Sequence, residues 1–272
     1  MKNVLLALAV ILLVYTLSFL MVGFVRKRLG RKPSKIRHFL LGFCTGTVLL
    51  FVVGLVFVNI HYSADAEALA VLKSPEGTTV KTIDGGYFLD GPGEETALVF
   101  YPGAKVDAEA YLPLLQTLSS QGIDCFLLQM PLRFALLGID AARPILDQYK
   151  YDKWLLAGHS MGGAAAANFA AANEGAVEGV VLLAAYPAKK LGASTSLLTI
   201  YGTEDKVLNR DSYENSKPNF PANAKEVVIK GGNHAQFGNY GEQSGDGTAS
   251  ISREEQQAKT ANAILEFAEG VN

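Results

Sequence analysis

Residues 154–172 read WLLAGHSMGGAAAANFAAA, and this stretch decides the fold. The apolar run at 154–157 predicts a buried β-strand, and the small-residue run at about 161–172 predicts a helix. Between them lies the pattern GxSxG, centred on Ser160. A serine held on a tight strand-to-helix turn takes a strained backbone conformation, and side chains two residues away on either side would collide there, which explains the glycines. Ser160 is therefore a candidate nucleophile, the alternative being a purely structural Gly-Ser turn.

Outward from this stretch, short apolar runs alternate with longer amphipathic ones. Strands are predicted at 79–83, 87–89, 97–101, 124–130, 179–184, 197–201 and 226–229, and helices at about 107–121, 138–149 and 253–268. Near-continuous apolar strands that alternate with helices indicate a parallel sheet covered on both faces. The sequence thus predicts one α/β domain over residues 66–272, built on a doubly wound, mostly parallel sheet.

A serine hydroxyl needs a base, and the chain has four histidines. His38 lies in a basic loop between two apolar stretches, and His61 follows the second of these stretches. His159 is adjacent to the serine on a turn that directs neighbouring side chains apart. His234 follows the last predicted strand, so it should lie at the carboxyl edge of the sheet together with Ser160. Elimination and position both select His234 as the base, against the alternative of a surface histidine in a Gly-rich loop.

The acid that orients the base should follow a strand between these two residues. The strand at 197–201 is followed by Gly-Thr-Glu-Asp, which offers Glu204 and Asp205. We favour Asp205, and Glu204 stays open. Its role would be to orient His234 and stabilise the imidazolium.

Backbone N–H groups should hold the oxyanion of such a reaction. The N-terminus of the helix after Ser160 offers the N–H of Met161. The loop after the strand at 97–101 offers the N–H of Ala104. Lys105 could anchor an anionic substrate or be solvated, and Arg133 could meet a substrate carboxylate or a membrane surface, or lie in an ordinary buried connection.

These motifs resemble those of the α/β-hydrolase superfamily, from about residue 95 to the C-terminus. The resemblance rests on Tyr-Pro-Gly at 101–103, GHSMGG at 158–163, GTED at 202–205 and GGNHAQFG at 231–238, in the chain order Ser160, Asp205, His234. The connection between the strands at 179–184 and 197–201 is too short to hold a helical lid domain. In this the chain resembles the compact, capless branch of the superfamily, which includes dienelactone-hydrolase-like and esterase-like proteins. The resemblance implies a Ser-Asp-His hydrolase without metal or cofactor. Two departures are that dienelactone hydrolases use a cysteine nucleophile, and that this chain lacks the HGGG loop of many lipases.

Residues 1–62 have a different character. The stretches 4–25 and 39–60 carry no charge, and each is long enough to cross a bilayer as a helix. The loop at 26–38 holds seven Lys and Arg residues, which places it in the cytoplasm by the positive-inside rule. The sequence therefore predicts a transmembrane hairpin in the cell membrane, with the catalytic domain extracytoplasmic.

Charge and small residues add two expectations. Residues 1–60 hold eight Lys and Arg and no acid, whereas the rest holds sixteen against 26 acids, so nothing favours nucleic-acid binding. Gly42 and Gly46 form a GxxxG pattern in the second span. It could mark a homodimer face, although packing against the first span, or chance, is the interpretation we favour.

The sequence as a whole predicts a membrane-anchored serine hydrolase of the carboxylesterase type, acting on small-molecule or lipid-like esters through an acyl-enzyme. An acyltransferase on the same fold is the nearest alternative. A non-catalytic envelope protein that keeps the fold for partner binding is the alternative from another class.

Overall fold

The computed structural model describes residues 2–30, 34–73 and 76–271. The chain divides into two compact units, Met1–Ile60 and His61–Asn272. The short segment after the second helix belongs to the second unit, because Tyr62 forms a parallel β-bridge with Val106 and Asp65 caps the next helix. The second compact unit therefore includes residues that precede the predicted α/β domain at 66–272.

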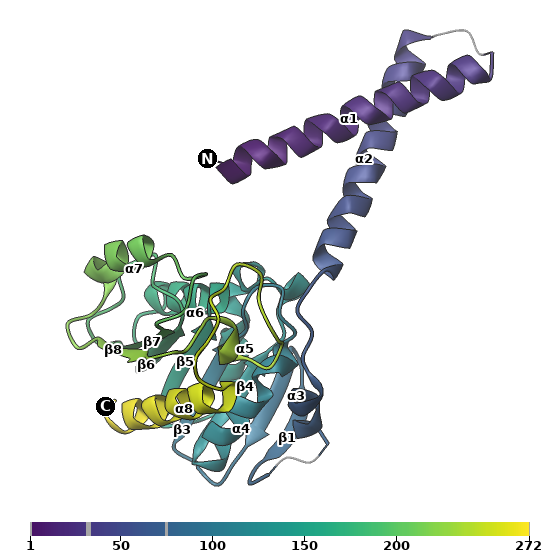
Figure 1. Cartoon of the computed structure of the whole chain (residues 1–272). Helices are drawn as coiled ribbons and strands as arrows, with labels where there is room; N and C mark the ends of the chain where they lie inside the picture. The colour runs from purple at the N-terminus through teal and green to yellow at the C-terminus, as the bar shows by residue number, and fades with distance from the viewer. Residues whose placement is uncertain (1, 31–33, 74–75, 272) are drawn as a thin grey trace. The chain divides into compact units, whose positions relative to one another are not determined.

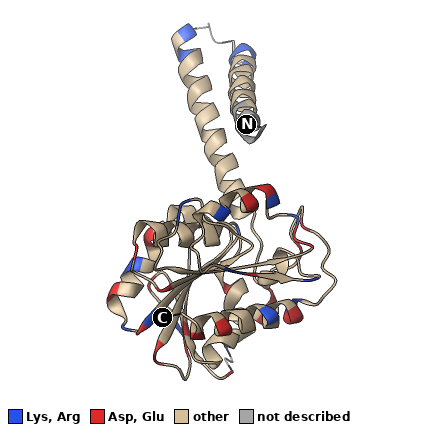
Figure 2. Ribbon diagram, turned by 90° about the vertical axis from the view of Figure 1, so that its left-hand side faces the viewer, with Lys and Arg blue, Asp and Glu red and all other residues tan. Residues whose placement is uncertain are grey.

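The first unit is a helical hairpin of α1 (Lys2–Arg28) and α2 (Lys35–Asn59). Both helices are long and apolar enough to cross a membrane by length and composition. Apart from Lys2, their charged residues lie near the ends that the loop joins (Figure 2). A Cβ atom on Gly42 or Gly46 would overlap the rings of Phe19 and Tyr15 of α1, so these glycines allow the close packing of the two helices. A homodimer through this face would have to displace those two rings.

The second unit is built on one eight-stranded sheet (Figure 1). The strands are β1 (Thr79–Ile83), β2 (Gly86–Asp90), β3 (Thr96–Tyr101), β4 (Ile123–Leu128), β5 (Lys153–His159), β6 (Gly179–Leu183), β7 (Ser196–Gly202) and β8 (Lys225–Ile229). Their order is β1-β2-β4-β3-β5-β6-β7-β8. The first two strands are antiparallel to their neighbours, and β4, β3 and β5 to β8 are parallel. The mostly parallel sheet predicted from the sequence is confirmed.

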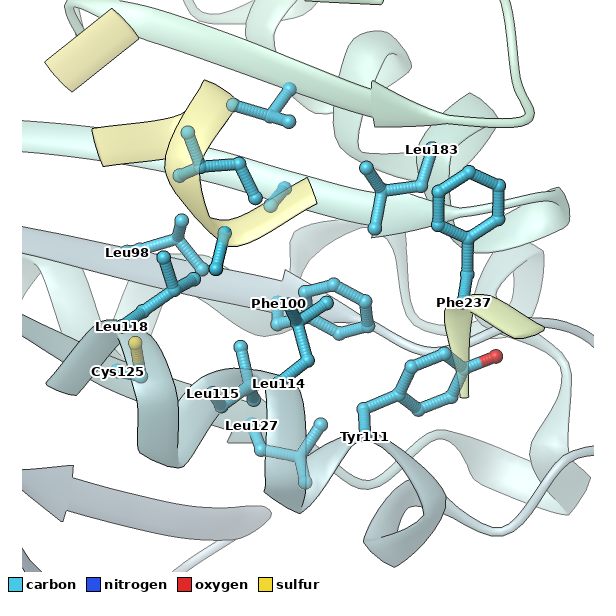
Figure 3. Packing of buried hydrophobic residues seen from close by; sticks show 14 of the residues in the cluster. Leu98, Phe100, Tyr111, Leu114, Leu115, Leu118, Cys125, Leu127, Leu183 and Phe237 are labelled. Atoms are coloured by element: carbon cyan, nitrogen blue, oxygen red, sulfur yellow. The ribbon is translucent and has the colours of Figure 1, made fainter. Parts of the chain in front are cut away.

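Helices cover both faces of the sheet. Successive side chains of a strand point to opposite faces, so each buried strand contributes to a core on either side. The helices are α3 (Ala66–Val71), α4 (Leu112–Ser120), α5 (Arg143–Gln148), α6 (Met161–Ala172), α7 (Arg210–Ser216) and α8 (Arg253–Glu269). On β3, Leu98 and Phe100 pack with α4 and α8 in one core (Figure 3), whereas Val99 packs with α5 and α6 in the other. The doubly wound arrangement follows from this alternation.

The structure differs from the sequence-based expectations mainly at the ends and in the connections. The helix predicted at 107–121 begins as a 3₁₀ turn, Ala108–Tyr111, and becomes α-helical only where Pro113 takes an early helix position. The helix predicted at 138–149 is a 3₁₀ turn followed by the short α5. The short helices α3 and α7 were not anticipated, because six or seven residues carry too little periodicity to detect.

Candidate active site

Ser160 sits on a sharp turn between the end of β5 and the start of α6. Its φ of 54° and ψ of −122° lie outside the regions that residues with a side chain ordinarily adopt. A Cβ atom on Gly158 would come within 2.5 Å of the Gly162 backbone, and one on Gly162 within 2.1 Å of the Tyr101 carbonyl oxygen. The strained serine and the two obligatory glycines are the features that the GxSxG pattern predicts for a nucleophile elbow.

His234 and Asp205 form a buried pair in the same unit. Asp205 follows β7, and its Oδ2 lies 2.9 Å from His234 Nδ1. The side chains of both are at most 1% exposed. The other carboxylate oxygen of Asp205 accepts hydrogen bonds from the N–H groups of Val207 and Leu208, at 2.9 and 2.8 Å. The carboxylate is thus held in place from both sides and faces the imidazole through one oxygen.

Glu204 has a different environment from Asp205. Its Oε1 accepts a hydrogen bond from the adjacent Thr203 hydroxyl, and the structure records no contact between its side chain and His234. Of the two acids that the sequence left open, only Asp205 bonds the histidine.

Ser160 and His234 line one pocket of about 330 Å³. The rest of its lining is largely apolar and includes Leu136, Val207, Leu208 and the four alanines 164, 184, 185 and 188. Nε2 of His234 has no hydrogen-bond partner within the described residues, so the imidazole does not bond the serine hydroxyl here. Such bonds are often long or absent in unliganded enzymes and tighten when substrate binds.

Met161 and the loop after β3 lie around the same serine. Met161 is the first residue of α6 and lines the pocket. The backbone of Tyr101 and Pro102 lies directly against Gly162, as the overlap of a Cβ atom there with both carbonyl oxygens shows. The loop that carries Ala104 therefore approaches the N-terminus of α6, where the first N–H groups have no partner within the helix.

Lys105 and Arg133 do not line the pocket that holds Ser160. The guanidinium Nε of Arg133 donates to Asp107 Oδ1 at 2.7 Å. Lys105 has a φ of 59°, and its backbone N–H donates to the Arg133 carbonyl oxygen. These two residues therefore hold the loop after β3 and the segment that follows β4 together.

The segment at 131–137 is partly exposed rather than an ordinary buried connection. Leu132, Leu136 and Leu137 are 58%, 48% and 61% exposed, and Leu136 reaches the pocket. The segment at 236–250 does not reach the pocket. Residues of that segment instead support the histidine, because Asp246 accepts from the N–H of Ala235 and the Gly247 carbonyl from the side chain of Asn233.

His159 is the residue that the sequence-based reasoning set aside and the structure brings to the site. Its ring is 1% exposed and lies 4.4 Å from that of His234, measured between centroids. Its Nδ1 lies 2.9 Å from the hydroxyl of Tyr111, which is fully buried. Adjacent side chains on a turn do point apart. His234, however, comes from another loop, and its ring lies beside that of His159, a contact that no local pattern reveals.

The donors of a metal site are absent from the described residues: no three His, Cys, Asp or Glu side chains there come together as a group that could hold an ion.

The comparisons with known proteins agree with the fold and the motifs. A family model described as "Alpha/beta hydrolase family" matches residues 97–258, more than half of the chain. The protein belongs to the α/β-hydrolase family. The sequence has no significant match among curated proteins.

Several solved structures share the fold. A dienelactone hydrolase from Anabaena variabilis aligns with a TM-score of 0.53 at 16% identity, over 70% of this chain and 99% of that one. A hydrolase from Thermoplasma acidophilum aligns with 0.53 at 12%, over 70% and 100%. An α/β-hydrolase from lagoon-sediment metagenome of Mar Chica, Morocco, aligns with 0.53 at 16%, over 70% and 98%. These identities establish the shared fold and not a shared substrate.

Proposed function

We propose that the protein is a membrane-anchored serine hydrolase that cleaves carboxylic esters or related acyl bonds through Ser160, His234 and Asp205. One observation carries the proposal. The strained Ser160 lines the same pocket as His234, and Nδ1 of His234 bonds the buried carboxylate of Asp205. A strained residue is retained where the surrounding structure enforces it, and such residues cluster at active sites.

The Asp205–His234 bond fixes the tautomer of the neutral imidazole. A carboxylate accepts, so Nδ1 of His234 carries the proton and Nε2 is left with a lone pair. Nε2 can then take the proton of Ser160 Oγ as the Oγ–acyl bond forms. It passes that proton to the departing alkoxide, which leaves the acyl group on Oγ. Water, deprotonated by the same Nε2, then attacks the acyl carbon, the Oγ–acyl bond breaks, and the free acid leaves as Oγ regains a proton. Asp205 stabilises the imidazolium in both halves of the reaction.

The oxyanion would be held by the N–H groups of Met161 and Ala104. Met161 is supported by its place at the N-terminus of α6 and on the pocket wall. Ala104 is supported by the close approach of the preceding loop residues to Gly162. Donors fixed in place before the reaction cost no reorganisation when charge develops on the carbonyl oxygen.

The pocket favours an uncharged substituent next to the scissile bond. Its walls are formed by alanines and by Leu136, Val207 and Leu208. Arg133 is engaged by Asp107 outside the pocket, and Lys105 does not line the pocket either. We infer a small-molecule or lipid-like ester with an apolar acyl or alcohol group.

The hairpin of α1 and α2 would anchor the enzyme with its basic loop in the cytoplasm and the catalytic unit outside. The apolar length of both helices and the cations at their joined ends support this topology. A cysteine placed in the 61–272 unit at an exposed position such as Asn223 should react with an impermeant maleimide in intact cells. Reaction only after lysis would contradict the topology.

The activity is tested by hydrolysis of p-nitrophenyl esters of two to eight acyl carbons. The wild type should hydrolyse them, and Ser160→Ala and His234→Ala should lower kcat by at least about 10³-fold. Added alcohols and amines should leave the product the free acid. Transfer of the acyl group to the acceptor would identify an acyltransferase, and hydrolysis unaffected by either substitution would rule out the mechanism.

A further inference from the structure

A buried phenol links the loop after β3 to His159, the histidine of the GHSMGG motif. The hydroxyl of Tyr111 accepts a hydrogen bond from the N–H of Gly103 at 3.0 Å and lies 2.9 Å from His159 Nδ1. Tyr111 is fully buried, and its ring packs on Phe100, with a centroid distance of 4.8 Å (Figure 3). Gly103 directly precedes Ala104, the candidate oxyanion donor, so Tyr111 fixes the backbone next to that donor.

The same hydroxyl is a hydrogen-bond partner of His159. Because its oxygen accepts from Gly103, its single proton is available for Nδ1 of His159. Burial raises the pKa of Tyr111, and burial together with the neighbouring His234 lowers the pKa of His159 well below its ordinary range. Both groups are therefore neutral at neutral pH, so His159 adds no positive charge beside His234.

His159 in turn supports the ring of His234. The two rings lie 4.4 Å apart between centroids, and Phe237 packs on His159 at 5.6 Å. A Cβ atom on Gly103 would come within 2.9 Å of both the Tyr111 hydroxyl and His159 Nδ1, so the loop, the phenol and the imidazole fit closely. The contacts form one continuous chain from the backbone of Gly103 to the ring of His234.

We propose that Tyr111 and His159 are positioning residues that couple the oxyanion loop to the imidazole of His234. The proposal rests on the proposed function, because it assigns these residues a role in that reaction. Neither residue need touch the substrate. An oxyanion donor or a base displaced by about 1 Å can cost on the order of 10²-fold in rate, so a rigid link between the two has a direct catalytic effect.

Tyr111→Phe tests the link, because it keeps the packed ring and removes both hydrogen bonds. We expect kcat to fall about 10- to 100-fold, with KM within about twofold, because the loss affects the transition state more than substrate binding. Tyr101→Phe is the matched control. Its buried hydroxyl also makes two hydrogen bonds, accepting from Ala142 N–H and donating to the Ile139 carbonyl, and both partners lie away from the GHSMGG motif in the sequence.

Two substitutions of His159 separate its hydrogen bond from its ring. His159→Asn places an amide near the position of Nδ1 and keeps a partner for Tyr111, whereas His159→Phe keeps a ring against His234 and removes the bond. We expect His159→Phe to lose as much kcat as Tyr111→Phe. The double variant Tyr111→Phe/His159→Phe should lose no more kcat than either single variant, since each single substitution already breaks the same link. His159→Asn should recover part of that loss.

The outcomes separate this inference from the proposed function. Hydrolysis that survives in Ser160→Ala contradicts the function and the positioning role together. Hydrolysis that needs Ser160, yet has the same kcat in Tyr111→Phe as in Tyr101→Phe, overturns the positioning role alone. Additive losses in the double variant also overturn it, because independent effects on folding would add while a shared link would not.

Discussion

Single residues at the site are held by contacts that leave them few alternative positions. One carboxylate oxygen of Asp205 accepts from two backbone N–H groups, and the other bonds His234. The side chains of both residues are buried. A buried pair that loses one partner leaves the other polar group unsatisfied, which is costly in both stability and orientation. The neighbouring Glu204 shares none of these contacts with the histidine.

Asp205→Ala and Glu204→Ala should therefore differ sharply. We expect the first to lower kcat by about 10³- to 10⁴-fold, because His234 loses the group that fixes its tautomer and stabilises its charge. The second should leave kcat within about twofold. Steady-state kinetics on a p-nitrophenyl ester would measure both, and equal losses would show that Asp205 is not the orienting acid.

His159 also predicts a pH dependence of stability. Its folded-state pKa is lowered, so below about pH 6.5 the unfolded chain binds a proton there that the folded chain does not. Stability present at neutral pH is thus lost as the pH falls, by up to about 1.4 kcal/mol per pH unit for this one group. Urea unfolding at pH 7.5, 6.5 and 5.5 should show a steeper loss for the wild type than for His159→Asn. Parallel curves would contradict a buried neutral His159.

At the scale of elements, the junction of β5 and α6 depends on backbone contacts that permit no side chain. A Cβ atom on Gly162 would lie 2.1 and 2.4 Å from the carbonyl oxygens of Tyr101 and Pro102, which belong to β3 and the loop after it. The glycine thus brings the nucleophile helix and the oxyanion loop together. The loop cannot give way without moving the candidate donor.

Gly162→Ala should accordingly destabilise the 61–272 unit by about 3 kcal/mol and abolish hydrolysis in the fraction that still folds. Gly270→Ala is the control, because its nearest neighbour would be Lys225 Nζ at an ordinary 3.5 Å. Thermal unfolding followed by circular dichroism measures both. A Gly162→Ala protein with the Tm and activity of the control would show that the close approach is unimportant.

The segment at 131–137 contributes one apolar side chain, Leu136, to the pocket. Leu136 is half exposed and reaches the pocket, whereas Leu132 is more exposed and does not. Leu136→Ala should raise KM for six- and eight-carbon esters about three- to tenfold, with little effect on the acetate, because apolar contact with the longer chain is lost. Leu132→Ala should change neither value. The same KM for all chain lengths in both variants would place the acyl group elsewhere.

At the scale of the whole molecule, the chain divides into two compact units, Met1–Ile60 and His61–Asn272. The sequence predicts the α/β class, the mostly parallel sheet and all eight of its strands, because buried parallel strands are near-continuous apolar runs between glycines and helices. The contact between Asp205 and His234 was also predictable, since both follow strands whose carboxyl ends share one edge of the sheet.

What the sequence could not supply is contact between residues far apart in the chain. Tyr111 lies 48 positions before His159, and its side chain looks like one more apolar residue on a helix face. The exposure of Leu132 and Leu137 likewise depends on how 3₁₀ turns orient them, and not on composition. The residues that support the candidate site can therefore be found only from tertiary packing, whereas its candidate reactive residues can be found from local sequence patterns.

The central claim is that Ser160 is an activated nucleophile, and covalent labelling tests it most directly. Full-length protein in detergent, shown to be folded, would be treated with a fluorophosphonate and its modified peptides mapped, with Ser160→Ala alongside. The account predicts modification confined to Ser160 in the wild type, none in Ser160→Ala, and markedly slower labelling in His234→Ala. A folded wild-type protein that stays unlabelled, or that is labelled equally in Ser160→Ala, would contradict it.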